Sequence, residues 1–559
     1  MLRCAFVLST ALLLASGCSD SQSSQDDPDV GADQDTAPDV PVDDTSDPED
    51  GGSDVDPDLA DVGGPEGPEA TVAQGTLRGV EAGGALGFKA IPYAAPPTGD
   101  LRWRPPAAPA TWDGVRDATA FGSGCPQRDL LAPTAPATGD EDCLTLNVWT
   151  PSLTPDAPLP VMVWVHGGAW ITGLASTNSY DGTSLSQQGV IVVTLNYRLD
   201  VLGYLAHPKL TEENGGTSGN WGQLDQRAAL AWVRENIAAF GGDPERVTLF
   251  GESAGGHSVC THMMISQGLF QAAISQSGLC LFQLDDLEAA HGHGSNLAAD
   301  VGCGDAEDVL ACLRAVPLED IVAITDPKAI PGSLLTHPLP FKPVVDGTVV
   351  TEQPSAAFAA GRVAQVPFLG GTTADEANLF HVGLLHTAVR DEAQYLSALR
   401  TRFGDDAEAI LAQYPAGDDP GAALKRATTE GLFACPARRT ARAMADHPSG
   451  DAGTWLYVFD AEPAGVALPG LGAFHGAELA YVFGNDFGAF GKIGEEQRPL
   501  SQAVQRYWTR FAMNHDPNGG DEPAWPAFET ESDTIMRLAP TPAAETGYLS
   551  DACDFWDGL

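Results

Sequence analysis

A serine flanked by glycines near the middle of the chain limits the possible folds more than any other feature. The segment GESAG (251–255) follows the apolar, β-favouring run Val247–Phe250 and precedes small residues with a helical pattern. This order predicts a strand, a tight turn and a helix. The glycines let the backbone crowd at the turn and leave Ser253 exposed at its apex. We therefore interpret Ser253 as a nucleophile rather than as a serine of an ordinary strand–helix turn.

The pattern around this turn extends over most of the chain. Apolar, β-favouring runs alternate with helical spacing, which is clear in Leu224–Phe240 and Ala503–Met513. Such alternation predicts an α/β fold with a mostly parallel central sheet and helices on both faces. We find no internal repeat, and residues 71–559 are expected to form one large domain. The other expected strands are Val161–Val165, Val190–Leu195, Ala272–Ser275, Val366–Leu369 and Trp455–Phe459.

The N-terminus has the pattern of an export signal. Arg3 precedes an apolar run that ends near Leu14, and small residues then lead to Cys18. The run is too short to cross a bilayer as a permanent helix. We expect residues 1–17 to be a lipoprotein-type signal peptide and Cys18 to be the lipidated first residue. The protein would then be anchored to a bacterial membrane, at the outer membrane or cell surface. The alternative is a plain secretory signal and a secreted protein.

An acidic segment follows the signal. Residues 18–70 are rich in Asp, Pro, Ser and Gly, and no Lys or Arg occurs between Arg3 and Arg78. Such a segment buries too little apolar surface to become ordered, and its charges repel one another, so we expect a disordered linker. The whole chain has a net charge of −47, and its acidic excess continues beyond the linker. This charge argues against nucleic acid as a partner, and a membrane is expected only through the lipid at Cys18.

A nucleophilic serine needs further groups around it. A histidine must accept the serine proton, a carboxylate must orient that histidine, and backbone N–H groups must stabilise the oxyanion. Five segments of the chain together resemble the type B carboxylesterases, a family with the α/β-hydrolase fold that includes cholinesterases and the non-catalytic neuroligins. These segments are EDCLTLNVWTP (141–151), VMVWVHGGAW (161–170), GNWGQLDQRAALAWVRENIAAFGGDP (219–244), the serine turn, and AFHGAELAYVFG (473–484).

The resemblance assigns the catalytic residues by position. Ser253 matches the nucleophile and His475, in the segment FHGAE, matches the base. The segment GGTTADEANLF (370–380) matches the acid segment of the family, which assigns the acid to Glu376. The adjacent Asp375 is the alternative acid. Only one of the two is expected to face the histidine, because neighbours at an extended strand end point in opposite directions.

The resemblance also implies an oxyanion hole in the loop after the strand Val161–Val165. The backbone N–H groups of Gly168, Ala169 and Ala254 are the expected donors. Ala169 stands where cholinesterases have glycine, but its backbone still donates. We interpret His166, just before these residues, as an organiser of the loop rather than as a catalyst.

Cysteine use agrees with export. After Cys4 in the signal and Cys18 at the expected lipid site are set aside, eight of the ten cysteines remain, and an exported chain favours disulfides. Cys260 and Cys280 either pair or remain buried thiols. The resemblance implies three further pairs, namely Cys125 with Cys143, Cys303 with Cys312 and Cys435 with Cys553.

No cofactor or metal is expected. His291 and His293 form an H-x-H pair without a third ligand in the nearby sequence, so we interpret them as surface histidines. The sequence thus predicts an exported serine carboxylesterase that acts on a small-molecule ester through an acyl-enzyme on Ser253. The alternatives are a lipase that acts at a lipid interface and a neuroligin-like binding protein on the same fold.

Overall fold

The computed structural model describes residues 67–128, 136–323, 339–384, 389–450 and 452–559. The expected signal, Cys18 and nearly all of the acidic linker lie outside the described residues. The first strand, β1 (Glu69–Val72), begins two residues before the expected start of the domain. The last two residues of the expected linker, Glu69 and Ala70, belong to this strand, and Arg78 donates a hydrogen bond to Glu69 across the β1–β2 hairpin.

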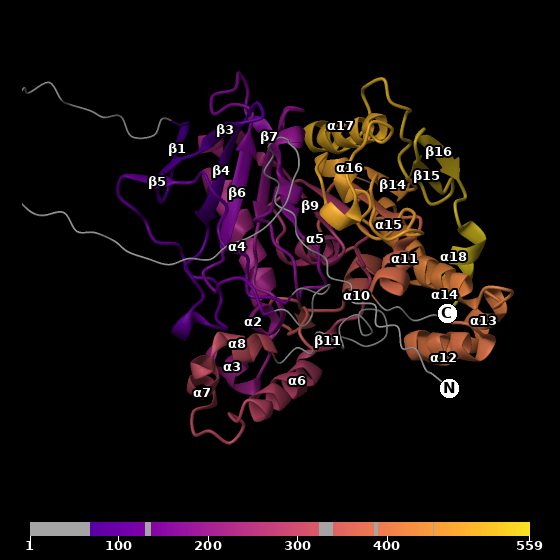
Figure 1. Ribbon diagram of the computed structural model, residues 1–559, viewed down its shortest axis with the longest axis horizontal. Coiled ribbons are helices and arrows are strands. Elements are labelled where there is room, and N and C mark those ends of the chain that lie inside the picture. The colour runs from indigo at the N-terminus through magenta and orange to yellow at the C-terminus, as the bar shows by residue number, and fades with distance from the viewer. Residues whose placement is uncertain (1–66, 129–135, 324–338, 385–388, 451) are drawn as a thin grey trace, which may run out of the picture. The chain divides into compact units, whose positions relative to one another are not determined.

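The described chain forms a large twisted sheet with helices on both faces (Figure 1). Seven of its strands, from β8 through β15 in the order below, are parallel, whereas β16, β6, β4 and β3 add antiparallel edges. The expected mostly parallel sheet is therefore confirmed. In spatial order the strands are β16 (Ala543–Thr546), β15 (Thr534–Leu538), β14 (Thr454–Phe459), β13 (Phe368–Thr373), β10 (Ala272–Gln276), β9 (Gly242–Glu252), β7 (Leu159–Val165), β8 (Ile191–Leu195), β6 (Thr145–Thr150), β4 (Ala85–Pro92) and β3 (Val80–Ala82).

Alternating side chains of the central strands separate two apolar cores. On β7, Val161, Val163 and Val165 belong to one core, while Met162 and Trp164 belong to the other. The first face is covered by α4 (Trp221–Asn236), α5 (Ala254–Ile265) and α15 (Cys435–Ala445), and the second by α16 (Leu479–Phe483) and α17 (Arg498–Asn514). Because both faces are buried, the strands are almost uniformly apolar, which made them recognisable in the sequence.

Smaller elements surround this framework. A small sheet is formed by β1, β2 (Gly75–Arg78) and β5 (Val115–Asp117), and a short pair by β11 (Asp285–Asp286) and β12 (Val344–Val345). Among the described residues, no helix has both the length and the apolar content needed to cross a bilayer. The remaining helices are α1 (Thr183–Ser186), α2 (Asp200–Tyr204), α3 (Pro208–Glu213), α6 (Leu287–Asp300), α7 (Val309–Ala315), α8 (Leu318–Ala323), α10 (Pro354–Ala359), α11 (Glu376–Asn378), α12 (Glu392–Phe403), α13 (Ala407–Gln413), α14 (Pro420–Thr428) and α18 (Ser550–Asp557).

Four disulfide bonds link described residues. Three are the pairs implied by the resemblance, and the fourth joins Cys260 of α5 to Cys280, the pair that the sequence left open. Both of these sulfur atoms are buried, and both lie within hydrogen-bonding distance of the hydroxyl of Ser275. The other pairs are Cys125–Cys143, Cys303–Cys312 and Cys435–Cys553.

Candidate active site

Ser253 occupies a strained turn between β9 and α5. Its φ of 55° and ψ of −122° lie in a region that residues with a side chain rarely adopt, and its N–H donates to the carbonyl of Gln276 at 2.9 Å. The flanking glycines are required by close backbone contacts. A Cβ on Gly255 would lie 2.0 Å from the carbonyl oxygen of Val165, and one on Gly251 would lie 2.6 Å from the backbone of Gly255. The turn therefore holds the serine hydroxyl at a fixed apex, as the sequence pattern predicts.

The loop after β7 lies directly against this apex. A Cβ on Gly167 would lie 2.8 Å from the carbonyl oxygen of Glu252 and 3.1 Å from Cβ of Ser253, so a side chain here would push the loop away from the turn. The next two residues, Gly168 and Ala169, have φ values of 106° and 56°, which turn the loop sharply. Among the described residues, the N–H groups of Gly168, Ala169 and Ala254 have no hydrogen-bond acceptor. Unpaired backbone donors beside a nucleophile are what an oxyanion requires.

His166 stabilises this loop through the contacts of its ring and backbone. Its ring stacks on Tyr197 with centroids 4.4 Å apart, and its Nδ1 lies 2.9 Å from the carbonyl oxygen of Gly167. The Tyr197 hydroxyl donates to the carbonyl of His166 at 2.8 Å. Burial lowers the pKa of His166 to about 4, so the ring is neutral at ordinary pH. These contacts agree with an organising role rather than a catalytic one.

Glu376 holds the histidine that the sequence identified. Its Oε2 lies 2.5 Å from Nδ1 of His475, and its Oε1 accepts from the Ser277 hydroxyl at 2.5 Å and from the N–H of Thr373 at 2.8 Å. The carboxylate of Glu376 is fully buried. It lies at the start of α11, at the carboxyl end of β13. An acid in this position fixes the orientation of the imidazole and stabilises its charged form.

The neighbouring Asp375 has a different contact. Its Oδ2 accepts from the N–H of Ala473 at 3.0 Å, and its own N–H donates to the carbonyl of Ala473 at 2.9 Å. Asp375 thus holds the backbone two residues before His475, whereas Glu376 holds the imidazole ring. The geometry favours Glu376 as the acid.

The second nitrogen of the imidazole faces a carboxylate to which the sequence motifs assigned no role. Nε2 of His475 lies 3.2 Å from Oε1 of Glu252, the residue immediately before the nucleophile. Within the described part of the chain, no hydrogen bond joins Nε2 to the hydroxyl of Ser253. Catalytic hydrogen bonds often form only when substrate is bound, so this arrangement is consistent with a resting state.

Three buried carboxylates surround His475 and change how the group titrates. Burial alone would lower the pKa of His475, but the charges of Glu252 and Glu376 outweigh it and raise that pKa to about 9. Burial raises the pKa of Glu252 to about 7, and the charge of Glu376 adds to this effect while that of His475 opposes it. Burial, with the charges of Glu252 and Glu376, raises the pKa of Glu478 to about 8. Protons are therefore shared within one cluster rather than held by independent groups.

Aromatic rings enclose the histidine. The centroids of Phe380 and Phe433 lie 5.1 Å and 5.3 Å from that of His475, and the two phenyl rings stack on each other at 6.0 Å. Their packing limits the access of water to the imidazole. Phe433 lies far from every motif in the sequence, and no local pattern could have identified it. Glu252 and Glu478, by contrast, lie within recognised motifs, and a search for carboxylates near the catalytic residues could have found both.

The H-x-H pair takes no part in this site. Nε2 of His291 lies 2.8 Å from the hydroxyl of Thr211, and Nε2 of His293 lies 3.8 Å from Asp285. Both side chains are half-buried and partly exposed at the surface. No group of three or more metal-binding side chains occurs among the described residues.

Comparisons with known proteins agree with this geometry. The model of the carboxylesterase family matches residues 66–556. The chain is 40% identical to the para-nitrobenzyl esterase of Bacillus subtilis (strain 168), over 84% of this chain and 94% of that protein. It is 37% identical to the fumonisin B1 esterase of Sphingopyxis macrogoltabida, over 82% of this chain and 84% of that protein. It is 36% identical to human cocaine esterase, over 86% and 88%. A solved structure of a PNB esterase superimposes with a TM-score of 0.74 at 36% identity, over 87% of this chain and 99% of that chain.

Proposed function

Because the chain belongs to the carboxylesterase family, we propose that it hydrolyses carboxylic esters through an acyl-enzyme on Ser253. Its relatives show that the protein is a carboxylic-ester hydrolase with the α/β-hydrolase fold. A non-catalytic, neuroligin-like role is thereby set aside. The proposed acyl-enzyme rests on the position of Ser253, which is strained at the apex of its turn beside the loop of Gly167, Gly168 and Ala169.

The reaction would proceed in two halves. The Ser253 hydroxyl attacks the ester carbonyl while Nε2 of His475 takes its proton, and Glu376 stabilises the imidazolium through Nδ1. The N–H groups of Gly168, Ala169 and Ala254 bind the oxyanion. His475 then protonates the departing alcohol, and the acyl group remains on Ser253. Water, deprotonated by His475, attacks the acyl-enzyme, and the serine takes back its proton as the carboxylic acid leaves.

The substrate is a small-molecule ester, and its acyl-chain length remains to be measured. The relatives are named for three different esters, so their names alone do not select one. A panel of p-nitrophenyl esters of rising acyl length, assayed below and above the solubility limit of the longest members, would define the preference. Activity on dissolved short-chain esters supports the proposal. Activity that rises only when a lipid interface forms would instead identify a lipase.

We also propose that the protein is exported and anchored through Cys18. The support is the N-terminal sequence together with four disulfide bonds in the described chain, a number typical of an oxidising compartment. The acidic linker would hold the catalytic domain away from the membrane surface.

The test of the catalytic proposal is Ser253→Ala, which removes one hydroxyl and leaves the fold intact. Turnover of p-nitrophenyl acetate should be lost, while thermal unfolding stays unchanged. Retained turnover in a folded variant would rule out Ser253 as the nucleophile.

A further inference from the structure

One short segment of chain lies between the C-terminal helix α18 and the pair His475 and Glu376. That segment is η6 (Thr429–Ala434), a π-helical turn between α14 and α15. Such wide turns occur often at functional sites. One side of η6 faces α18, and the other side faces α11 and His475.

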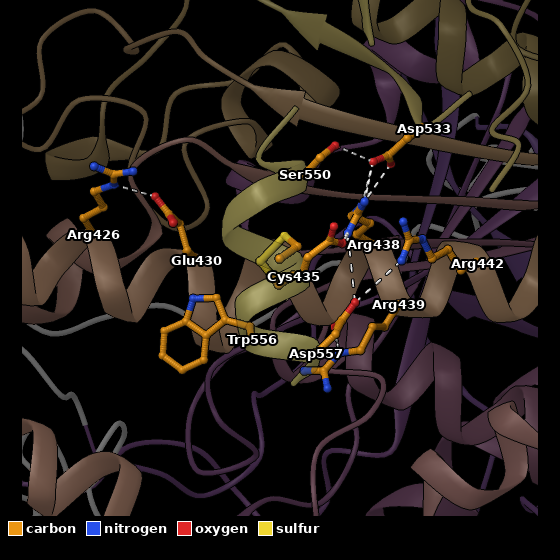
Figure 2. The surroundings of a disulfide bond; sticks show 12 residues. Arg426, Glu430, Cys435, Arg438, Arg439, Arg442, Asp533, Ser550, Trp556 and Asp557 are labelled. Carbon is orange, nitrogen blue, oxygen red and sulfur yellow. Dashed lines mark hydrogen bonds and ion pairs between the residues drawn. A yellow bond between two sulfur atoms is a disulfide. The ribbon is translucent and has the colours of Figure 1, made fainter. Parts of the chain in front are cut away.

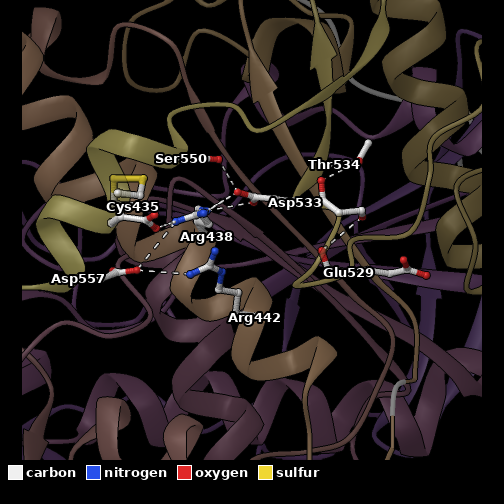
Figure 3. Close-up of polar contacts among 11 residues, drawn as sticks. Cys435, Arg438, Arg442, Glu529, Asp533, Thr534, Ser550 and Asp557 are labelled. Atoms are coloured by element: carbon white, nitrogen blue, oxygen red, sulfur yellow. Dashed lines mark hydrogen bonds and ion pairs between the residues drawn. A yellow bond between two sulfur atoms is a disulfide. The ribbon is translucent and has the colours of Figure 1, made fainter.

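Several bonds fix α18 to the start of α15. The disulfide Cys435–Cys553 joins the residue after η6 to the middle of α18 (Figure 2). Beside it, Arg438 of α15 donates to Asp533 at 2.6 Å (Figure 3). Arg438 also lies 3.2 Å from Asp554 of α18. The hydroxyl of Ser550, at the start of α18, donates to Asp533 at 2.8 Å. Both partners of the disulfide are buried, and so are Arg438 and Asp533, so these two links are shielded from water, whereas the side chain of Asp554 is exposed.

Trp556 carries the contact from α18 to η6. A Cβ on Gly431 would lie 2.5 Å from the Trp556 indole, so the ring rests directly on the backbone of η6. The indole N–H donates to the hydroxyl of Tyr414 at 2.8 Å, and that hydroxyl donates to Oε2 of Glu430 at 2.6 Å. Arg426 binds the other oxygen of Glu430 at 2.7 Å. Two successive residues of η6 are therefore held from the side of α18.

The opposite side of η6 contacts His475 and the residue that follows Glu376. The hydroxyl of Thr429 accepts from the N–H of Ala377, the residue after Glu376, at 3.1 Å. The ring of Phe433 packs on that of His475, with centroids 5.3 Å apart. Trp556 and His475 are thus connected by one short, mostly buried segment. No space separates its Gly431 from the Trp556 indole.

We propose that Trp556 and Phe433 are positioning residues, through which the C-terminal helix holds His475 and Glu376 in the orientation that catalysis needs. The proposal rests on the proposed function, in which His475 is the base and Glu376 its acid. Trp556 fixes η6 from one side, and Phe433 transmits that position to the imidazole ring. Trp556 acts through η6, and Phe433 acts through its packing on the imidazole ring of His475.

The test combines single variants with a double variant in the full-length protein. Trp556→Leu and Phe433→Leu should each lower kcat for p-nitrophenyl acetate about tenfold to a hundredfold, with little change in KM, because a displaced base costs rate rather than binding. Trp556→Phe keeps a ring on Gly431 and should restore most of the loss. The double variant should be no slower than the slower single variant, since both changes act through one path.

A second readout separates positioning from general loosening. A looser contact with Glu376 lowers the pKa of His475, which Glu252, Glu376 and Glu478 raise, so the pH profile of kcat/KM should move to lower pH in both variants. The matched control is Leu399→Ala, which removes a buried side chain from the apolar cluster that contains Trp556. It should lower the unfolding temperature without changing kcat or the profile.

The outcomes distinguish the two proposals. Wild-type kcat in folded Trp556→Leu, additive losses in the double variant, or an equal loss in Leu399→Ala would each overturn the positioning role. Phe433→Leu changes nothing on α18, so it keeps the test decisive should Trp556→Leu fail to fold. Ser253→Ala is assayed in parallel. If it retains turnover, the proposed function fails, and the positioning role fails with it.

Discussion

Nε2 of His475 lies 3.2 Å from Oε1 of Glu252, the residue that immediately precedes the proposed nucleophile. The imidazole is therefore held between two carboxylates, because Nδ1 contacts Glu376 at 2.5 Å. A buried histidine between two acids binds its proton tightly, and a protonated imidazole cannot accept the proton of Ser253. The surroundings that orient the base thus also determine the pH at which it acts.

The pH dependence of hydrolysis should reflect this arrangement. Since Glu252 and Glu376 raise the pKa of His475 to about 9, kcat/KM should increase with pH through about 9 as the base loses its proton. In Glu252→Gln one negative charge beside Nε2 is removed. The pKa of His475 should fall, and the rising limb should move to lower pH. A limb that stays in place or moves to higher pH would show that Glu252 does not control the base.

Substitutions at the acidic pair should rank clearly. Glu376→Gln should lower kcat by about 10³–10⁴-fold, because the imidazole loses the charge that orients it. Asp375→Asn keeps an oxygen that can accept from Ala473, and it should have a far smaller effect. Steady-state kinetics on one short ester measures both. The reverse ranking would assign the acid to Asp375.

Much of this fold was recognisable in the sequence because its strands are buried on both faces. The six expected strands correspond to β7, β8, β9, β10, β13 and β14, with ends shifted by a few residues. Five strands of the large sheet, β3, β4, β6, β15 and β16, were not predicted. The edge strands β3 and β16 are short and mostly exposed, β4 and β15 are only partly buried, and β6 is buried but has polar residues between its apolar ones. The helix expected over Leu224–Phe240 changes to a tighter turn at Ile237, and the helix expected from Ala503 begins earlier, at Arg498.

The site was predictable where residues act locally and not where the fold brings them together. The turn at Ser253 has a local signature in its flanking glycines, so the sequence predicts it, although its contacts with Val165 and Gln276 come from the fold. The aromatic contact of Phe433 with His475 depends on the packing of η6, and no spacing in the sequence reveals it. The choice between Asp375 and Glu376 required the position of the Ala473 backbone.

The disulfides should stabilise the protein according to the loops that they close. Cys435 and Cys553 are separated by 118 positions, whereas Cys303 and Cys312 are separated by nine. Loop entropy predicts that replacing the first pair with serines lowers the free energy of unfolding by about 4–5 kcal/mol, and the second pair by about 2–3 kcal/mol. Urea denaturation of the two double variants measures the difference. Equal losses would mean that loop length does not control the effect.

Membrane association should depend on Cys18. The full chain, produced in a host that processes lipoproteins, should carry its esterase activity into the membrane fraction. Deletion of residues 1–66 should leave a dispersed enzyme with the same ester preference, and Cys18→Ser should release the activity or block maturation. An unmodified Cys18 in the intact mass of the mature protein would favour simple secretion.

Covalent labelling distinguishes Ser253 from every other serine as the nucleophile. A fluorophosphonate ester should add one phosphonyl group to the intact protein, abolish hydrolysis in step with the labelling, and appear on the peptide that contains Ser253. Ser253→Ala should remain unlabelled. Labelling of another serine, or labelling of Ser253 without loss of activity, would contradict the account.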